Sequence, residues 1–509
     1  MAGNDCVDLL VVGGGINGAG IARDAAGRGL KVALVEQDDL ANATSSASTK
    51  LIHGGLRYLE FAEFRLVRES LMERERLLAI APHIIRPMQF VLPHVEGLRS
   101  RWLIRVGLFF YDHAGGRRSL PGSRGTRLAG TGFGQPLNPA IAHGFVYSDC
   151  WVDDSRLVVL NAMDAAERGA DIRPRTRFLS ATPCNGVWTA ACQELIGGRQ
   201  FEIRARAVVN AAGPWVGNVL QQLQQVPRQG PQVRLVKGSH IVVRKLYEGD
   251  HAYTLQNPDG RVVFTIPCED DYTAIGTTDV AFAGDVHGAV ISEEEISYLC
   301  ATINQYFTSR RLTPADVIWS YAGVRPLFDD AAADISKVTR DYKLELQTES
   351  GGAVALSVFG GKITTYRKLA EAVLARLQPL LGGSTASWTA GSPLPGGDLP
   401  HSDPAQFLAE CHRRWPQLPP QLIGRMARSY GTRIERVLAD VRSLEDMGRQ
   451  HGAGLSDTEV MYLRTNEWAH SASDILWRRT KLGLHMSPQE RATFEQTFVS
   501  TSLRRSGAV

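Results

Sequence analysis

Three glycines near the amino terminus have the spacing of a loop that binds a dinucleotide. Gly13, Gly15 and Gly18 fit the pattern G-x-G-x-x-G, and the acidic residue Glu36 follows them. In such loops the first glycine allows a tight turn, the second lets the backbone approach a pyrophosphate, and the third allows close helix–strand packing. A carboxylate at Glu36 would accept hydrogen bonds from an adenosine ribose and would repel the 2′-phosphate of NADP. The alternative is an ordinary glycine turn.

The elements around these glycines come in the order that a dinucleotide site requires. The apolar run Val7–Val12 reads as a strand, Ile21–Gly29 as a helix, and Val32–Val35 as a second strand that Glu36 closes. The pyrophosphate is expected at the amino terminus of the helix, where unpaired N–H groups and the helix dipole favour anions. This context makes the pattern much more specific than the glycines alone.

The segment after the second strand favours FAD over NAD. Residues 43–58 read ATSSASTKLIHGGLRY, where a simple NAD domain would continue with another strand and helix. Their hydroxyl groups and glycines suit an extended segment along a long cofactor; a solvated loop is the alternative. Two later strands, within 207–215 and 357–366, end in small residues, and we expect each of them to bring the chain back close to that cofactor. A helix follows the second, and its positively polarised start suits a reduced, anionic flavin.

Composition is that of a soluble, multi-domain protein. The chain has 509 residues, 44% of them hydrophobic and 21% charged, and a net charge of 56 − 53 = +3. That near-balance argues against a nucleic-acid-binding protein. The seven cysteines include no C-x-x-C pair, so we expect neither a metal site nor a redox dithiol. We expect neither a transmembrane helix nor a signal peptide.

Longer motifs are spread over nearly the whole chain. They are GGGINGAGIARDAAGRGL (13–30), TSSASTKLIHGGLRYLE (44–60), EFRLVRESLMERERLL (63–78), YSDCWVDDSRL (147–157), NAAGPWV (210–216), KGSHIVV (237–243), IGTTD (275–279), YAGVRPL (321–327), TRDY (339–342), SVFGGKITTYRKLAE (357–371) and WRRTKLG (477–483). Together these motifs closely resemble the aerobic, FAD-dependent sn-glycerol-3-phosphate dehydrogenase family, within the D-amino-acid-oxidase-like flavoproteins.

The resemblance implies a function and a setting. The reaction would be oxidation of sn-glycerol 3-phosphate at C2 to dihydroxyacetone phosphate, by hydride transfer to N5 of FAD, in glycerol and glycerophospholipid breakdown. Electrons would pass to ubiquinone or another membrane quinone. The enzyme would be a homodimer, attached peripherally to the cytoplasmic face of the inner membrane and partly cytoplasmic. The fold would be α/β: a Rossmann-like FAD-binding domain, an antiparallel-sheet substrate cap and an α-helical C-terminal domain.

The residues assigned to FAD lie in the glycine loop, the segment after the second strand, and the later motifs. They are Gly13, Gly15, Asn17, Gly18, Glu36, Ser45, Ser46, Thr49, Lys50, Leu51, His53, Gly54, Gly55, Gly213, Trp215, Asp279, Gly360, Gly361, Lys362 and Thr364. Asp279 either holds the cofactor, braces the site or caps a turn.

A small phosphorylated polyol needs fixed cations, and arginine is favoured because its fork can bind two phosphate oxygens. The candidates are Arg57, Arg325, Arg340 and Lys362, with Tyr58 adding a phenol hydrogen bond. Solvated surface groups are the alternative, and for Arg340 the sequence does not choose between the two. Pro326 favours an extended or turn conformation at Arg325.

The reaction also needs a group that takes the proton of the C2 hydroxyl as the hydride leaves. Histidine suits this task because its pKa is close to neutral. We favour His240 as the base or as the group that orients the hydroxyl, and expect His53 to pack beside the flavin. A hydrogen-bonded structural histidine is the alternative for each. The predicted catalytic set is His240, Arg325 and Lys362.

Three domains are expected. The sequence assigns 1–80, 150–235 and 345–385 to the FAD-binding domain, 81–149 and 236–344 to the cap, and 398–509 to the C-terminal domain, with helical segments at 421–429, 433–447 and 457–467. Strand-like runs at 239–243, 261–266 and 273–277 indicate a sheet in the cap. The C-terminal domain has no assigned chemistry, and packing or dimerisation is expected of it.

Residues 99–111, RSRWLIRVGLFFY, mix basic and aromatic residues as interfacial segments do. The preferred interpretation is a buried amphipathic element whose arginines reach solvent. The helix after Lys362 is a second candidate for membrane contact, although it should be largely buried if it begins at the flavin.

Other functions remain open on the sequence. An oxidase that passes electrons from glycerol 3-phosphate to O₂ would share these motifs. An amine or hydroxy-acid oxidase would use the same fold and a similar arginine pair for a carboxylate. A flavin-binding regulatory protein is a non-enzymatic alternative.

Overall fold

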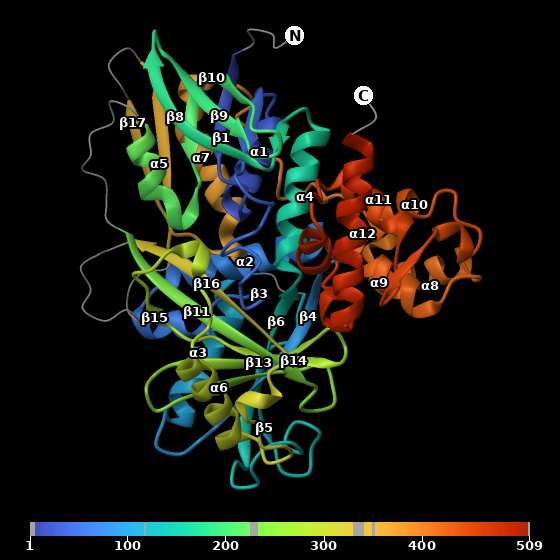
Figure 1. The fold of residues 1–509 in the computed structure, drawn as a ribbon. Helices are drawn as coiled ribbons and strands as arrows, with labels where there is room; N and C mark the ends of the chain where they lie inside the picture. The colour runs from blue at the N-terminus through green and yellow to red at the C-terminus, as the bar shows by residue number, and fades with distance from the viewer. Residues whose placement is uncertain (1–5, 117–118, 224–232, 329–340, 349–351, 507–509) are drawn as a thin grey trace.

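The protein is described here by a computed structural model that covers residues 6–116, 119–223, 233–328, 341–348 and 352–506. Two large sheets, A and B, lie one above the other, and a mostly helical C-terminal unit flanks them on one side (Figure 1). The predicted α/β class, with a Rossmann-like sheet, a cap sheet and a helical C-terminal domain, is confirmed. The domain boundaries given above remain a prediction.

The central strands of sheet A run parallel, so that four of them end at the same edge of the sheet. Its strands are β1 (Val7–Val12), β2 (Val32–Val35), β7 (Asp171–Arg173), β8 (Thr176–Cys184), β9 (Val187–Glu194), β10 (Gln200–Asn210), β17 (Lys343–Thr348) and β18 (Val354–Phe359). The order β18-β10-β1-β2-β7 is parallel throughout, whereas β17 and the β8–β9 hairpin pair antiparallel. In the parallel centre, β1, β2, β10 and β18 therefore all end at the same edge, where ligands bind in open α/β sheets.

Helices alternate with the strands along the chain. They are α1 (Ile16–Gly27), α2 (Phe64–Ile80), α3 (Arg101–Ala114), α4 (Asp154–Glu167), α5 (Val216–Gln222), α6 (Glu293–Tyr306), α7 (Tyr366–Leu381), α8 (Pro404–Arg414), α9 (Pro420–Tyr430), α10 (Ile434–Val437), α11 (Asp457–Asn466) and α12 (Pro488–Ser506).

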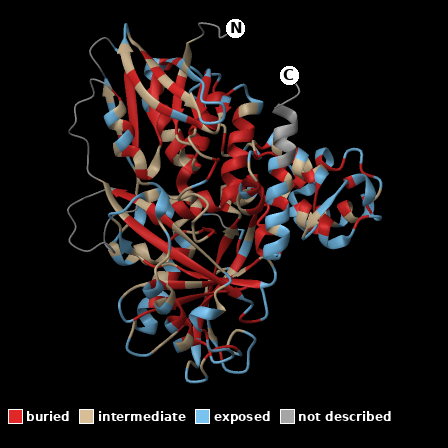
Figure 2. Cartoon of the chain, in the orientation of Figure 1, coloured by how far each residue is buried: buried red, intermediate tan, exposed pale blue. Residues whose placement is uncertain are grey.

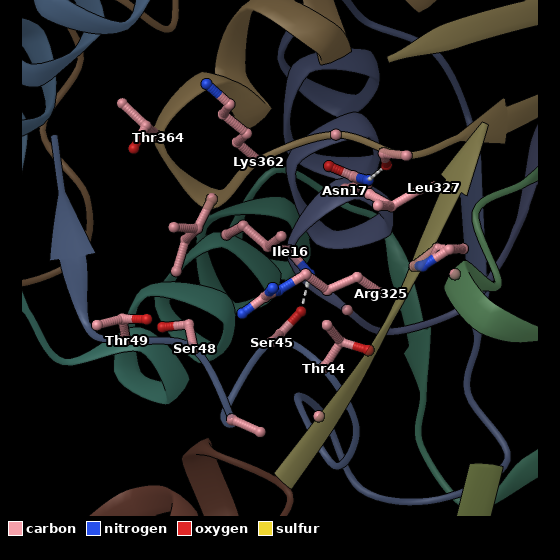
Figure 3. Close-up of a pocket in the computed structure, with 18 of the residues that line it drawn as sticks. Ile16, Asn17, Thr44, Ser45, Ser48, Thr49, Arg325, Leu327, Lys362 and Thr364 are labelled. Atoms are coloured by element: carbon pink, nitrogen blue, oxygen red, sulfur yellow. Dashed lines mark hydrogen bonds between the residues drawn. The ribbon is translucent and has the colours of Figure 1, made fainter. Parts of the chain in front are cut away.

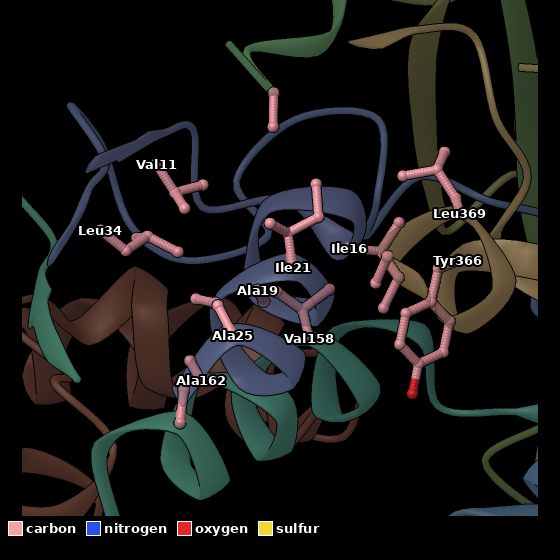
Figure 4. Packing of buried hydrophobic residues seen from close by; sticks show 14 of the residues in the cluster. Val11, Ile16, Ala19, Ile21, Ala25, Leu34, Val158, Ala162, Tyr366 and Leu369 are labelled. Carbon is pink, nitrogen blue, oxygen red and sulfur yellow. The ribbon is translucent and has the colours of Figure 1, made fainter. Parts of the chain in front are cut away.

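Helix α1 packs deeply because its residues are small. Alanine and glycine along it let α4 and α7 approach closely, with Val158 and Tyr366 against its surface (Figure 4). A Cβ at Gly20 would collide with the Tyr366 ring, so this position requires glycine. Buried apolar residues of α1, α4 and α7 cover one face of sheet A, and the β8–β9 hairpin with α5 covers the other. Burial is concentrated in the strands and in the helices that face them (Figure 2).

Sheet B forms the cap. Its strands are β3 (Leu51–Ile52), β4 (Ile85–Pro93), β5 (Arg124–Arg127), β6 (His143–Val152), β11 (Val233–Arg244), β12 (Ala252–Gln256), β13 (Val262–Cys268), β14 (Tyr272–Gly276), β15 (Val280–Ala281) and β16 (Trp319–Phe328). Their pairing is antiparallel apart from β4 with β12. Helix α6 packs on this sheet through Leu299 and Ile303.

The C-terminal unit has its own apolar core, formed by α8 to α12 and the turns between them. A short β19–β20 pairing (Gln450–Gly452 with Leu455–Ser456) is its only strand pairing in the described residues. Helix α4 joins this unit to the rest of the protein: its Arg156 pairs with Glu467, and its Glu167 pairs with Arg433.

Three expectations about single elements were wrong. Helix α1 begins at Ile16, before the predicted Ile21, because the last glycines of the motif belong to its first turn. The predicted helix at 433–447 is only α10 plus short turns. There the Asp446 carboxylate accepts the N–H groups of Arg442 and Ser443, and such local bonds compete with helix.

The third concerns residues 99–111, which form α3 with Ile104, Leu108 and Tyr111 buried. Its other side is exposed rather than buried: Trp102 is 76% and Phe110 51% exposed. Amphipathic spacing predicted the two faces, but nothing in the described fold covers the aromatic one. No described helix combines the length and the apolar character that crossing a membrane requires.

Candidate functional site

A cavity of about 840 Å³ lies between the two sheets. The first residues after β1, β2, β10 and β18 all line it, so it opens at the carboxyl edge of sheet A. Its far walls come from β12, β13 and β16 of sheet B, and from α3 and the turn that precedes α2. The volume is in the range of sites for large organic ligands.

The glycine loop is shaped for a ligand that lies against the backbone. Gly13 has φ = 113°, a conformation that favours glycine, and a Cβ there would lie 2.6 Å from the carbonyl oxygen of Ala211. A Cβ at Gly18 would overlap the carbonyl oxygen of Gly13. At Gly15, by contrast, it would meet only Ser45 Oγ, at 3.1 Å, so this residue faces open space. Each glycine therefore has the role that the motif predicts.

The start of α1 is available to an anion. Gly15 caps the helix without a side-chain hydrogen bond, and the first turn contains no acidic residue. Ile16 N–H donates to Ser45 Oγ at 3.0 Å, and Asn17 Nδ2 donates to the carbonyl oxygen of Gly360 at 3.2 Å (Figure 3). Asn17 Oδ1 is buried and has no hydrogen-bond partner among the described residues. The pyrophosphate of a dinucleotide fits this end of the cavity.

Glu36 directly follows β2, and backbone N–H groups bind its carboxylate. Its Oε2 accepts the N–H of Gly14 at 2.6 Å and its Oε1 accepts the N–H of Asp38 at 2.8 Å. Burial raises the pKa of Glu36 to about 7, although the two backbone donors act in the opposite direction. The carboxyl group lines the cavity at the place where the sequence motif predicts the adenosine ribose.

Residues 43–58, called the strap below, run along the cavity, but not as the extended segment that the sequence predicted: they pass through turns, the short strand β3 and the start of a 3-10 helix at Leu56. Thr44 Oγ1 donates to the carbonyl oxygen of Val324 at 2.6 Å, which ties the strap to β16. The N–H of Gly54 donates to the hydroxyl of Tyr111 at 2.8 Å, and the ring of His53 meets Phe264 edge-on. The strap therefore connects sheet B, α3 and the glycine loop.

Arg325 enters the cavity from β16, as Figure 3 shows. Its Nη1 lies 2.5 Å from Asp279 Oδ1, and its Nη2 donates to Thr277 Oγ1 at 3.2 Å. Arg57 also lines the cavity, from the strap. Lys362 lines it from the segment before α7, with Nζ 3.7 Å from the centre of the Tyr58 ring. Three cationic residues from distant parts of the chain thus share one cavity.

His240 lies behind the cavity wall rather than in it. It is 1% exposed, its Nε2 is 3.1 Å from Thr49 Oγ1, and its ring stacks on Tyr321 with centroids 4.7 Å apart. Burial, together with the positive charges of Arg325 and Lys50, lowers the pKa of His240 well below its ordinary value. A neutral imidazole therefore reaches the cavity through the hydroxyl of Thr49, which lines it.

Most of the residues assigned from the sequence line this cavity. They are Gly13, Gly15, Asn17, Glu36, Ser45, Thr49, Leu51, His53, Gly55, Arg57, Tyr58, Gly213, Trp215, Asp279, Arg325, Gly360, Gly361, Lys362 and Thr364. The other assigned residues are not part of its lining: Gly18, Ser46, Lys50, Gly54 and His240. Arg340 lies outside the described residues.

Lys50 differs most from its expected place. Its Nζ is buried and forms an ion pair with Asp154 Oδ1 at 2.8 Å, while Ser48 Oγ donates to the same carboxylate. Asp154 is fully buried, so it requires a cation, and this requirement turns Lys50 away from the cavity.

Several lining residues were missed because their strands carry no functional motif. Thr254, Gln256 and Phe264 face the cavity from β12 and β13, and Arg177 and Phe178 from β8. The alternation of side chains along a strand identifies such faces only when the partner of each face is known.

The sequence matches two known families. Residues 8–367 match the family described as FAD dependent oxidoreductase, and residues 387–498 match the one described as the C-terminal domain of alpha-glycerophosphate oxidase.

Curated relatives cover nearly the whole chain. It is 54% identical to the glycerol-3-phosphate dehydrogenase of Pseudomonas aeruginosa over 490 residues, and the aligned region covers 96% of this chain and 94% of that protein. It is 50% identical to the D-erythritol 1-phosphate dehydrogenase of Brucella abortus, with 99% and 100% covered. It is 48% identical to the aerobic glycerol-3-phosphate dehydrogenase of Escherichia coli, with 98% of each covered.

Among solved structures, the glycerol-3-phosphate dehydrogenase from Bacillus halodurans, complexed with FAD, superposes with a TM-score of 0.74 and 27% identity. The match covers 98% of this chain and 94% of that one.

Proposed function

The chain belongs to the FAD-dependent oxidoreductases, in the family of aerobic glycerol-3-phosphate dehydrogenases, and on this premise we propose that it oxidises sn-glycerol 3-phosphate to dihydroxyacetone phosphate. FAD is its cofactor. The observation that carries the proposal is the group of three cationic residues, Arg57, Arg325 and Lys362, around a cavity that the glycine loop also lines. A three-carbon phosphate ester has the charge and size that such a group would hold.

Each cation has a distinct part in this proposal. Arg325 and Arg57 are the phosphate ligands, because a guanidinium can bind two phosphate oxygens at once. Lys362 supplies a further positive charge beside Tyr58. Arg340 remains a candidate from the sequence alone. With the phosphate fixed, we propose that the C2 hydroxyl faces the wall that carries Thr49, behind which His240 lies.

When bound, FAD supplies the hydride acceptor of the reaction. The protein must remove the proton of the C2 hydroxyl as the hydride leaves. His240 is the proposed base or orienting group, and because its ring lies behind the cavity wall, its neutral imidazole would accept the proton through the hydroxyl of Thr49. Its depressed pKa keeps it unprotonated, and therefore able to accept, at neutral pH.

We propose a membrane quinone, ubiquinone or a related one, as the electron acceptor. Between the turn at Leu56–Phe61 and α3, the cavity lining includes the apolar side chains of Leu56, Leu59, Leu103 and Phe110, beside the charged Glu60 and Arg99. The apolar side chains suit contact with a lipid-soluble ring. The alternative acceptor is O₂, as in an oxidase, and the relatives named above do not favour it.

Helix α3 is the proposed membrane contact. Its exposed side carries Trp102, Leu103, Phe109 and Phe110, and Arg101 and Arg105 lie on the same helix. Aromatic and basic residues on one amphipathic helix are typical of interfacial helices that bind anionic lipid. The enzyme would attach peripherally to the cytoplasmic face of the inner membrane, with some of it in the cytoplasm, and form a homodimer.

Anaerobic titration of the purified yellow protein with sn-glycerol 3-phosphate tests the substrate. We expect the visible flavin absorbance to bleach, and glycine, sarcosine and lactate to leave it unchanged. D-Erythritol 1-phosphate belongs in the same series, because a relative at 50% identity is named for it. Bleaching by an amino acid or hydroxy acid alone would contradict the proposal. Quinone reduction against peroxide yield then separates dehydrogenase from oxidase.

A further inference from the structure

Two arginines of the C-terminal unit converge on one buried carboxylate of the FAD-binding domain. Arg479 Nη1 and Nη2 donate to Asp39 Oδ2 and Oδ1, both at 2.8 Å, and Arg478 Nε lies 2.5 Å from Asp39 Oδ2. Asp39 and Arg479 are each 1% exposed. Both arginines end the π-helical segment η10 (Asp474–Arg479), within the motif WRRTKLG.

Asp39 belongs to the loop that closes the adenosine end of the cavity. Glu36, Asp38 and Ala41 line the cavity, whereas the side chain of Asp39 points away from it to the arginines. The N–H of Ala41 donates to the carbonyl oxygen of Gly14 at 3.1 Å, which joins this loop to the glycine loop. The position of the Asp39 side chain therefore sets the position of its neighbours at the cavity.

A second connection fixes the same loop. The N–H of Arg175 donates to the carbonyl oxygen of Asp38 at 2.9 Å, and its Nη2 reaches Asp474 Oδ1 at 2.7 Å. Arg478 Nη2 binds the same carboxylate at 2.5 Å. Asp474 is fully buried. The C-terminal unit thus holds the loop from two sides, through Asp39 and through Arg175.

The chemistry of this junction makes it sensitive to a single change. Loss of Arg479 would leave the buried Asp39 carboxylate with Arg478, which Asp474 also binds, and a buried charge that loses part of its compensation is destabilised locally. Here the group that would relax is a short loop between β2 and the strap, because β2 itself is anchored by pairing on both sides. Displacement of the loop would move Glu36 and Asp38 at the ligand end.

We infer that Arg478 and Arg479 are positioning residues of the FAD site: through Asp39 they hold the loop at residues 36–41 in the shape that binds the adenosine half. The C-terminal unit is in this respect a part of the cofactor site, joined to it through Arg479, which lies 440 positions after Asp39 in the sequence. The inference rests on the assignment of Glu36 to the adenosine ribose, and it does not depend on which substrate the enzyme oxidises.

Flavin binding to the cofactor-free protein tests this inference without any activity assay. FMN carries the flavin and one phosphate but no adenosine, whereas ADP carries the adenosine half alone. For Arg479→Met we expect the affinities for FAD and ADP to fall by about 10- to 100-fold, the size of loss that removal of supporting residues causes at other sites. The affinity for FMN should stay unchanged, so that the preference for FAD over FMN is lost.

Two control variants separate this effect from general damage. Arg425→Met breaks an ion pair between a partly exposed arginine and the buried Glu459, at 2.7 Å, inside the C-terminal unit. Arg433→Met breaks a different contact between the domains, with Glu167 of α4 at 2.6 Å. Both should keep the preference for FAD, and Arg479→Lys should recover part of it because it restores the charge.

Asp39→Asn removes the negative charge of the same contact from the loop side, and it covers the case in which Arg479→Met does not fold. An unchanged ratio of FAD to FMN affinity in Arg479→Met or Asp39→Asn would overturn the inference. An equal loss of that ratio in Arg433→Met would also overturn it, because the effect would then follow from loosened domains rather than from the loop.

Discussion

Arg325 Nη1 and Asp279 Oδ1 are 2.5 Å apart inside the cavity, so the proposed phosphate ligand is already paired before any substrate binds. Thr277 accepts a further hydrogen bond from the same guanidinium. A partly buried guanidinium needs such partners, and they hold its fork in one orientation. For Asp279 the sequence left three roles open, which were holding the cofactor, bracing the site and capping a turn, and its pairing with Arg325 agrees with the second.

Arg325→Ala should raise the KM for sn-glycerol 3-phosphate by about 10- to 100-fold, because a hydrogen bond to a charged group contributes about 1.5–3 kcal/mol. The content of bound FAD should stay unchanged. Steady-state kinetics with the flavin content measured on the same sample check this. Arg99→Ala is the matched control, since Arg99 lines the cavity but pairs with Glu60 at 2.5 Å. Unchanged kinetics in Arg325→Ala would remove Arg325 from the substrate site.

His240→Gln should slow flavin reduction by about 100-fold or more, the contribution of a general base, with a smaller effect on substrate binding. Stopped-flow reduction at several substrate concentrations separates the two. Thr49→Val tests the route of the proton: an equal slowing is expected because the hydroxyl carries the proton to His240, whereas a normal rate would exclude Thr49 from the route. A wild-type rate in His240→Gln would exclude the assignment of the base.

The buried Glu36 carboxyl gives the cofactor-free protein a pH-dependent stability. Because burial raises its pKa from 4.5 to about 7, the folded form binds more protons than the unfolded one between these values. The free energy of unfolding should therefore fall as pH rises from 4.5 to 7, by on the order of 3 kcal/mol from this group. Urea unfolding of the wild type and of Glu36→Gln across this range measures it. Equal pH dependence in the two proteins would contradict the assignment.

Replacing Trp102, Phe109 and Phe110 together with serine should release the enzyme from vesicles of anionic phospholipid. Each buried aromatic side chain contributes about 1.5–3 kcal/mol, so the partition constant should fall by at least about 100-fold. Vesicle co-sedimentation measures it. Ile196→Ser with Val499→Ser is the control, because these side chains are each 59% exposed but lie far from α3 in the sequence. Undiminished binding of the triple variant would place the membrane contact elsewhere.

What the sequence determined is local. The strand β1, the glycine turn and the strand β2 with its terminal Glu36 were predictable, because backbone conformation at glycine and the burial of an apolar run depend on adjacent residues. The same holds for α7, whose apolar residues recur at helical spacing, and for the place of the strap at the cavity, although not for its conformation, which is made of turns rather than extended.

Only the tertiary structure decided which partners the charged and buried groups have. Lys50 is held by Asp154, Arg325 by Asp279, and Asp39 by an arginine 440 positions away. A charged side chain turns toward the opposite charge that burial leaves nearest to it, and that neighbour is set by how distant segments pack. Likewise the spacing along α3 defines two faces, and only the packed fold determines which of them meets solvent.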